Sequence, residues 1–163
     1  MQQHDVLFNL LELPCGVILK NRIAKSAMSD SLGDGSGHPT AEQSRLYQRW
    51  ADGGLAVSII GEVQPSPDFA EKPGNLVFDV NSDISRFQAL AEHGSGNGAL
   101  LWLQLGHAGA LAYRPISNPK GPSALDLPDL QCEGMSLEEI QQLPLDFAKT
   151  AKLAQQAGFG GVQ

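Results

Sequence analysis

Three short segments of the chain have the hydrophobic pattern of strands. Residues 21–28 form the first, residues 55–60 are a continuous apolar run between glycines, and residues 99–105 are an apolar run that contains one polar residue. Continuous apolar runs of this length are typical of strands that are buried on both faces, as in a parallel sheet. We expect Gly61 to end the second strand.

Amphipathic segments follow each of these strands and predict three helices. Thr40 can cap the first helix, which ends at residues 53–54, and residues 82–84 can cap the second. Ser136 and Glu139 have the spacing of a capping box at the start of the third helix. We expect this helix to reach about residue 157, with a break or bend near Pro144.

The remaining segments complete the predicted topology. A Pro-x-Gly turn within residues 10–20 indicates an N-terminal β-hairpin, and residues 158–163 begin a fourth strand. The proline-rich residues 62–80 and 110–135 are expected to be irregular. The sequence therefore predicts an α/β fold with a hairpin, about three complete β/α units and the start of strand four.

A closed barrel is favoured over an open doubly wound sheet. The glycines at residues 33–37 lack the G-x-G-x-x-G spacing of a dinucleotide-binding turn. A complete (β/α)₈ barrel needs about 250 residues, whereas this sequence has 163. We therefore interpret residues 1–163 as one partial domain, the N-terminal half of a (β/α)₈ TIM barrel, truncated at its C-terminus.

Composition narrows the possible partners and the cellular location. The net charge of −7 and the absence of a basic stripe argue against a nucleic-acid partner. The sequence has no apolar run long enough to span a membrane, and residues 1–5 do not resemble a secretory signal. We therefore expect a cytoplasmic protein. Cys15 and Cys132 match no metal or redox spacing and are interpreted as separate reduced thiols.

Polar residues at the carboxyl ends of the predicted strands are the candidates for chemistry, because barrel enzymes place their sites there. Gln104 interrupts an apolar strand and needs hydrogen-bond partners, which could be a heterocycle edge or neighbouring backbone. His107 follows on a tight turn and could contact a ligand, carry a proton or hold its own loop. Gly61 could end its strand or let a ring approach the backbone. Glu62 is interpreted as a loop carboxylate.

Seven segments together resemble the Old Yellow Enzyme family of NADH:flavin oxidoreductases. Most specific are the Asn-Arg-Ile strand at residues 21–23, the Gln-Leu-x-His strand end at residues 104–107 and the Gly-Pro-Ser-Ala loop at residues 121–124. The matching residues lie within segments 13–29, 45–51, 54–63, 73–75, 101–109, 121–124 and 157–162. The resemblance therefore covers essentially the whole chain in the family's order.

This resemblance implies a non-covalent FMN at the carboxyl ends of the strands. It places Ala27, Met28 and Ser29 against the isoalloxazine, Gly61 at its pyrimidine side and Gln104 at its hydrogen-bonding edge. It also implies ping-pong chemistry of the ene-reductase type, in which NAD(P)H delivers a hydride to FMN for transfer to an activated alkene or a related small-molecule acceptor. No metal is implied.

Two departures from the family pattern bear on activity. Ala110 stands where the family usually has arginine, and Ala27 stands where proline is common. The family's substrate-binding and proton-donating residues would follow Gln163, so we assign no catalytic residue and expect the 163-residue chain to be inactive alone. The alternatives are an incomplete gene model and a non-catalytic half-barrel that self-associates through its exposed edges as a structural or regulatory partner.

Overall fold

A parallel sheet with helices along one side forms the centre of the computed structural model, which describes residues 5–163. Residues 1–4, on which the expectation of no signal peptide mainly depends, lie outside the described residues. The central elements are β3 (Ala24–Ser29), α1 (Ala41–Asp52), β4 (Val57–Gln64), α2 (Ile84–Gly94), β6 (Leu100–Leu105), α3 (Leu137–Ala157) and β10 (Gly161–Val162).

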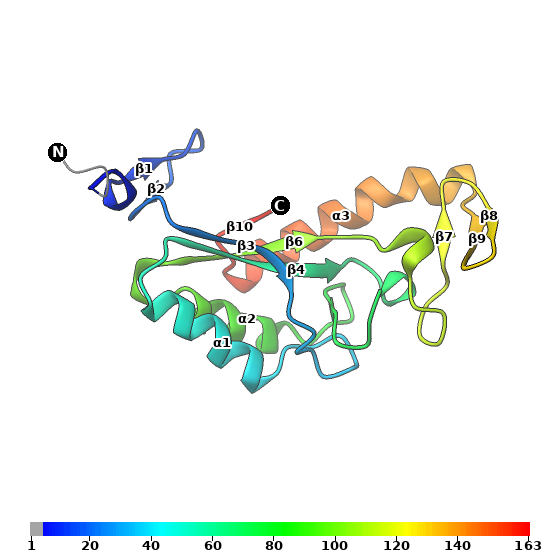
Figure 1. Ribbon diagram of the computed structural model, residues 1–163, viewed down its shortest axis with the longest axis horizontal. Helices are drawn as coiled ribbons and strands as arrows, with labels where there is room; N and C mark the ends of the chain where they lie inside the picture. The colour runs from blue at the N-terminus through cyan, green and yellow to red at the C-terminus, as the bar shows by residue number, and fades with distance from the viewer. Residues whose placement is uncertain (1–4) are drawn as a thin grey trace.

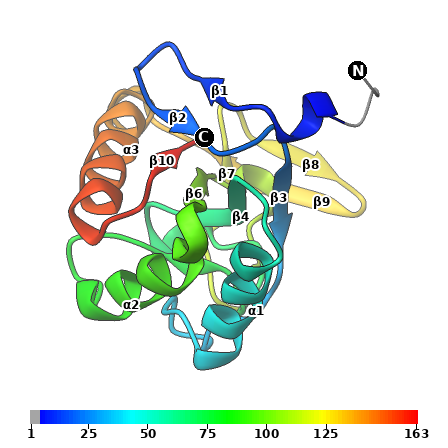
Figure 2. The same cartoon turned by 90° about the vertical axis from the view of Figure 1, so that its left-hand side faces the viewer.

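These elements form three β/α units and the start of a fourth strand, which confirms the predicted topology. The sheet order is β10-β6-β4-β3, and each pair of neighbours in it is parallel. Figure 2, viewed along the strands, shows α1, α2 and α3 arranged around the outer side of a curved sheet. The remaining hydrogen-bonded strand of this sheet is β5 (Leu76–Val77), which pairs with the end of β4.

Two small sheets lie at opposite ends of the central strands (Figure 1). The predicted N-terminal hairpin is present as β1 (Leu11–Glu12) and β2 (Ile18–Leu19), which pair antiparallel near the strands' amino ends. Beyond the carboxyl ends, β9 (Leu130–Gly134) lies between β7 (Lys120–Gly121) and β8 (Leu125–Leu127). Short 3₁₀ helices occur at Asp5–Phe8 (η1), Pro67–Phe69 (η2), Gly96–Gly98 (η3) and Gly109–Leu111 (η4).

The helix termini follow the capping residues that the sequence predicts. The Thr40 side chain accepts from the Gln43 N–H, and the Asp83 side chain accepts from the Ser85 N–H. Ser136 and Glu139 form both hydrogen bonds of a capping box. Pro144 lies within α3, which runs without a break from Leu137 to Ala157, so the expected break is wrong, whereas a bend near Pro144 stays a prediction.

Two segments expected to be irregular contain regular structure. β4 continues past Gly61 to Gln64, because the following residues pair with both β5 and β6. Residues 110–135 contain the antiparallel pair β8 and β9. Prolines surround these strands and hide their pattern, and each strand is too short to show a clear alternation.

The main core lies between the sheet and its helices. Its fully buried members include Tyr47 of α1, Phe87 of α2, and Leu101 and Leu103 of β6. On the other side of the sheet, Leu100 and Trp102 pack against a smaller cluster around Val57. Alternate residues of β6 therefore serve two different faces, as a strand requires.

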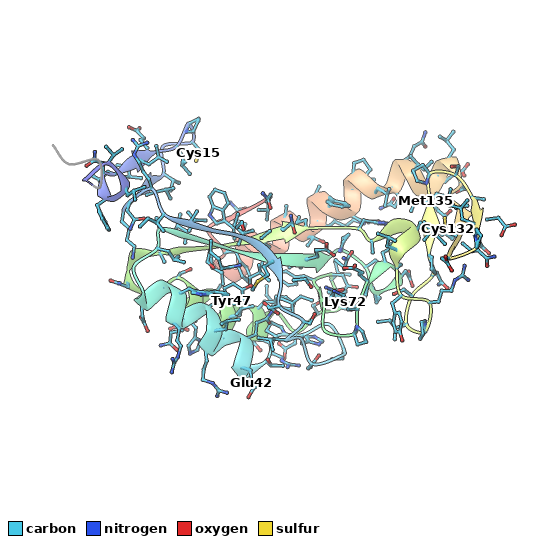
Figure 3. The ribbon with its side chains drawn as sticks, viewed as in Figure 1. Cys15, Glu42, Tyr47, Lys72, Cys132 and Met135 are labelled. Carbon is cyan, nitrogen blue, oxygen red and sulfur yellow. The ribbon has the colours of Figure 1, made fainter. Side chains whose placement is uncertain are left out.

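The two cysteines are far apart and are not joined by a disulfide bond. Cys15 is exposed in the N-terminal hairpin, whereas Cys132 is buried in β9 (Figure 3). Within residues 5–163, no helix is long and apolar enough to cross a membrane. The same residues contain no group of three or more His, Cys, Asp or Glu side chains arranged to hold a metal ion.

Candidate functional site

All five residues proposed for cofactor contact lie together in the carboxyl-terminal halves of three neighbouring strands. A Cβ atom built on Gly61 would lie 2.6 Å from Gln104 Oε1, 3.1 Å from the Met28 backbone nitrogen and 3.2 Å from the Ala27 Cβ. Ser29 pairs in register with Gly61 across the β3–β4 ladder. Gly61 thus lies between residues 27–29 and Gln104, which are more than seventy positions apart in the sequence.

Gly61 is buried within β4, and the space beside it is filled by the chain's own atoms. The amide oxygen of Gln104 occupies the place where a side chain would be, so only glycine allows Gln104 to lie against this strand. The Gly61–Glu62 peptide bond is cis. Direct contact between the Gly61 backbone and a cofactor stays a prediction.

Gln104 forms its hydrogen bond with another side chain instead of neighbouring backbone. Its Nε2 donates to the Oε1 of Gln163, at 3.1 Å. A primary amide carries two N–H groups and one carbonyl oxygen. One N–H and the carbonyl oxygen of Gln104 therefore have no hydrogen-bond partner within residues 5–163 and are suited to a ligand edge that offers both an acceptor and a donor.

The buried side-chain amide of Asn75 orients the Ser29 hydroxyl. Asn75 Nδ2 donates to Ser29 Oγ at 3.3 Å, while Asn75 Oδ1 accepts from the Lys72 N–H at 2.7 Å. Asn75 is only 3% exposed, so its amide is held in place by the loop that precedes β5. This arrangement leaves the Ser29 hydroxyl proton available to another acceptor.

A carboxyl pair borders the same region. Glu62 and Glu71 line a pocket of about 310 Å³ together with Gln104, Gly106 and His107. Burial raises the pKa of the Glu62 carboxyl, the neighbouring Glu71 carboxylate raises it further, and Lys72 opposes the shift. The structure therefore corrects the interpretation of Glu62 as a loop residue, because it belongs to β4 and faces a second carboxyl group.

His107 holds its own loop. Its Nδ1 accepts from the Gly109 N–H at 3.0 Å, and its ring packs on Phe69 with the two centroids 3.7 Å apart. Burial lowers the pKa of His107, which favours the neutral imidazole with its proton on Nε2. These contacts support the structural interpretation of His107 over a role as a proton carrier.

A family model described as NADH:flavin oxidoreductase / NADH oxidase matches residues 7–163. The chain belongs to this family. Among curated members, an uncharacterised oxidoreductase of Streptococcus pyogenes is 30% identical over 99% of this chain and 42% of its own length. A protein named NADH-dependent flavin oxidoreductase iliE, from Hypocrea jecorina, is 25% identical over 94% of this chain and 44% of its own length. The chain thus spans less than half the length of these relatives.

Solved structures agree with the barrel architecture. The Old Yellow Enzyme homologue of Zymomonas mobilis superposes with a TM-score of 0.86 at 22% identity, covering 96% of this chain and 47% of that one. Old Yellow Enzyme from Pichia sp. AKU4542 superposes with a TM-score of 0.85 at 20% identity, covering 96% of this chain and 45% of that one. The fold is therefore the N-terminal part of a flavin oxidoreductase TIM barrel.

Two residues of this family member that the sequence pattern did not single out also shape the region. Gln163 is the partner of Gln104. Gln64 is fully buried. With its amide nitrogen directed toward the carbonyl oxygens of Gly106 and Phe69, it donates a hydrogen bond to each of them. A polar side chain within an apolar strand was the signal that identified Gln104, and the same signal applies to Gln64.

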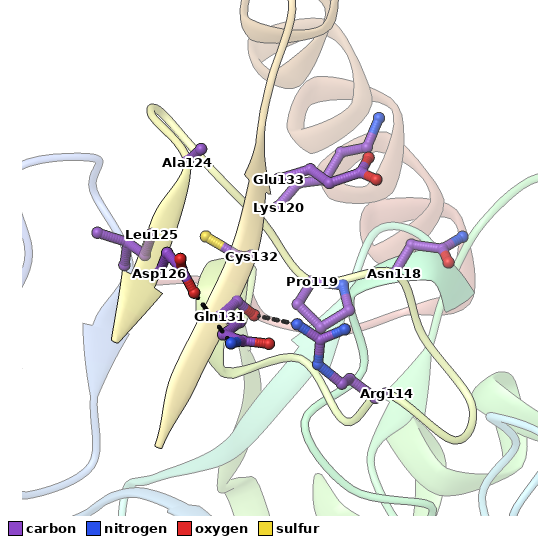
Figure 4. Close-up of a pocket in the computed structure, with 10 residues that line it drawn as sticks. All are labelled: Arg114, Asn118, Pro119, Lys120, Ala124, Leu125, Asp126, Gln131, Cys132 and Glu133. Carbon is purple, nitrogen blue, oxygen red and sulfur yellow. Dashed lines mark hydrogen bonds between the residues drawn. The ribbon is translucent and has the colours of Figure 1, made fainter. Parts of the chain in front are cut away.

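A separate pocket lies in the lobe formed by β7, β8 and β9 (Figure 4). It has a volume of about 670 Å³. Along its wall, the Arg114 guanidinium donates to the backbone carbonyl of Gln131, and the side-chain amide of Gln131 donates to the Asp126 carboxylate. Its lining mixes acidic and basic groups, and Lys120 is already paired with Glu139. The pocket therefore has no single charge preference and shares no lining residue with the pocket beside Gln104.

Proposed function

We propose that this chain binds FMN at the carboxyl ends of β3, β4 and β6 and contributes to an NAD(P)H-dependent oxidoreductase of the ene-reductase type. The observation that carries the proposal is the convergence of Ala27, Met28, Ser29, Gly61 and Gln104 at one place in the sheet. Family membership supports flavin and NADH chemistry in general. We further propose a cytoplasmic location and a single barrel domain that includes residues 1–163.

The residues present fit the edge of an isoalloxazine. Gln104 offers an N–H donor and a carbonyl acceptor, and Ser29 offers a hydroxyl. Met28 is 47% exposed and supplies a polarisable apolar surface at the same strand end. Bound FMN would supply the hydride-transfer chemistry from NAD(P)H to an electron-poor alkene or a related small molecule.

The contribution of this chain's own residues is binding and electrostatics. A hydrogen-bond donor held in advance near the pyrimidine edge stabilises negative charge that develops there, because it needs no reorganisation when the charge appears. Gln104 is such a donor, since its amide is already anchored through Gln163. The 163-residue chain is expected to bind FMN weakly and to show no useful turnover alone.

Tryptophan fluorescence can test the cofactor site. The chain has two tryptophans, and Trp102 lies two residues before Gln104 in β6 while Trp50 lies in α1. In a Trp50→Phe background, FMN should quench Trp102 saturably, and Gln104→Leu should weaken binding by roughly tenfold, as expected for one or two lost polar contacts. Gln48→Leu, on an exposed position of α1, serves as the control.

The outcome separates the proposal from its alternatives. Equal FMN affinity for Gln104→Leu and the parent, or no saturable quenching, would contradict the site. Alkene reduction by the 163-residue chain with added FMN and NADPH would contradict its expected inactivity.

Self-association is the second candidate function. Within the described residues, β3 and β10 are the two edges of the central sheet. Open edges and exposed apolar residues favour pairing with another chain. Light scattering coupled to size-exclusion chromatography tests this candidate, and a monomer at all concentrations would contradict it.

A further inference from the structure

The amide of Gln104 is confined from two directions by different strands. On the β4 side, its Oε1 occupies the space beside Gly61, and on the β10 side, its Nε2 donates to Gln163 Oε1. The final torsion of a glutamine side chain is soft and roughly two-fold, so an amide can exchange its oxygen and nitrogen ends at little cost. Which end faces which strand therefore depends on the partners of the amide.

Gln163 is itself held in register with Gln104. Its N–H donates to the Leu103 carbonyl at 2.8 Å, and its carbonyl accepts from the Leu105 N–H at 3.0 Å. These two bonds continue the parallel ladder between β10 and β6. Residues in register on parallel neighbours project to the same face, so the two glutamine side chains lie next to each other.

We propose that Gln163 is a positioning residue that fixes the orientation of the Gln104 amide and thereby its donor and acceptor pattern toward the flavin edge. The cofactor part rests on the proposed function. A flavin pyrimidine edge alternates N–H donors and carbonyl acceptors, so an amide with its ends exchanged would oppose donor to donor and acceptor to acceptor. Such a mismatch leaves polar groups unpaired and weakens binding.

The hydrogen-bonding capacity of residue 163 should decide the orientation. Gln163→Glu can only accept when ionised and should keep the Gln104 nitrogen directed toward β10. Gln163→Lys can only donate and should reverse the amide, which turns its nitrogen toward Gly61. Gln163→Met has similar length but offers no comparable partner, so both orientations should be populated. All three keep the backbone bonds of position 163.

Side-chain amide NMR of the apo chain measures this orientation without any cofactor. With ¹⁵N-labelled glutamine, the Gln104 NH₂ protons should show cross-relaxation to residue 163 in the parent and in Gln163→Glu. In Gln163→Lys, cross-relaxation to the Gly61 α-protons should replace it. Gln48→Met is the matched control on exposed α1 and should leave the Gln104 signals unchanged. Identical Gln104 contacts in the parent, Gln163→Met and Gln163→Lys would overturn the positioning role.

FMN titration then tests the consequence for binding. Gln163→Met should weaken FMN binding roughly fivefold, the effect of about one hydrogen bond, and Gln163→Glu should restore most of the lost affinity. If Gln163→Met binds FMN as tightly as the parent, the link between residue 163 and the cofactor is overturned. If the parent itself binds no FMN, the proposed function fails, whereas the amide orientation is still decided by the NMR contacts.

Discussion

The two faces of β6 differ in what their side chains do. Leu101 and Leu103 face the helices and are completely buried in the main core. Trp102 and Gln104 face the other side and are only partly buried, and Gln104 donates to the side chain of Gln163, the residue after β10. One six-residue strand therefore contributes stability on one face and candidate ligand-binding groups on the other.

The same division holds for β4. Ile60 belongs to the helix-side core, whereas Gly61 meets Gln104 on the other side. Close packing makes the helix side intolerant of changes in volume. The opposite side combines polar groups that are partly exposed and incompletely paired, which is typical of sites where binding is favoured over stability.

The largest expected effect is on the helix side. Phe87 is fully buried, and its ring stacks on Phe78 with centroids 3.8 Å apart and an interplanar angle of 5°. Phe87→Ala should lower the free energy of unfolding by about 4 kcal/mol through lost burial and a residual cavity. Urea denaturation measures this loss, with Val80→Ala, at a position 74% exposed, as the control. A loss below about 1 kcal/mol would show that this face is not the main source of stability.

An intermediate effect is expected at the contact between the strands of the candidate site. Gly61→Ala would place a Cβ 2.6 Å from Gln104 Oε1 and 3.1 Å from the Met28 nitrogen. Displacing these atoms should cost about 2 kcal/mol in urea denaturation and should also weaken FMN binding. Gly96→Ala is the matched control, because a Cβ at residue 96 would meet nothing within 4 Å and the φ of Gly96 is not left-handed. Equal effects of the two substitutions would contradict the close packing proposed for Gly61.

The smallest effect is expected for Glu62→Gln, which should raise the free energy of unfolding by an amount that depends on pH. Burial and the Glu71 carboxylate raise the pKa of Glu62 in the folded chain, so folding favours its protonated form. Stability should therefore decrease as the pH rises above the unfolded pKa of about 4.3. Glu62→Gln should stabilise the chain at pH 7 by less than about 1 kcal/mol, because the site is partly exposed.

Urea denaturation at pH 7 and at pH 4 checks this dependence. The gain from Glu62→Gln should shrink at the lower pH, where the carboxyl group is largely protonated in both states. Glu92→Gln, at an exposed position of α2, should have no comparable effect. A stabilisation that is the same at both pH values would assign the effect to something other than the carboxyl pair.

Local patterns were sufficient for most of the fold. Apolar runs identified β4 and β6, and the capping residues Thr40, Asp83 and Ser136 marked the starts of the three helices. These signals are local, because a cap satisfies backbone groups within one turn. The short strands β7 to β9 were missed because their stability depends on each other and not on a pattern within any one of them.

The candidate site was predicted as a set of residues but not as an arrangement. An amide inside an apolar strand identified Gln104, and the family resemblance added Ala27, Met28, Ser29 and Gly61. Neither indicated that Gln104 would pair with Gln163, since the two residues are 59 positions apart. Their contact requires the parallel register between β10 and β6.

The sequence by itself determined the order of strands and helices, the helix starts and the family, because these depend on local periodicity, capping and motif spacing. Only the tertiary structure decided that β4 extends past Gly61, that Glu62 faces Glu71 and that Gln104 lies between Gly61 and Gln163. Such contacts depend on strand register and side-chain packing between distant segments, and both are set when the sheet assembles.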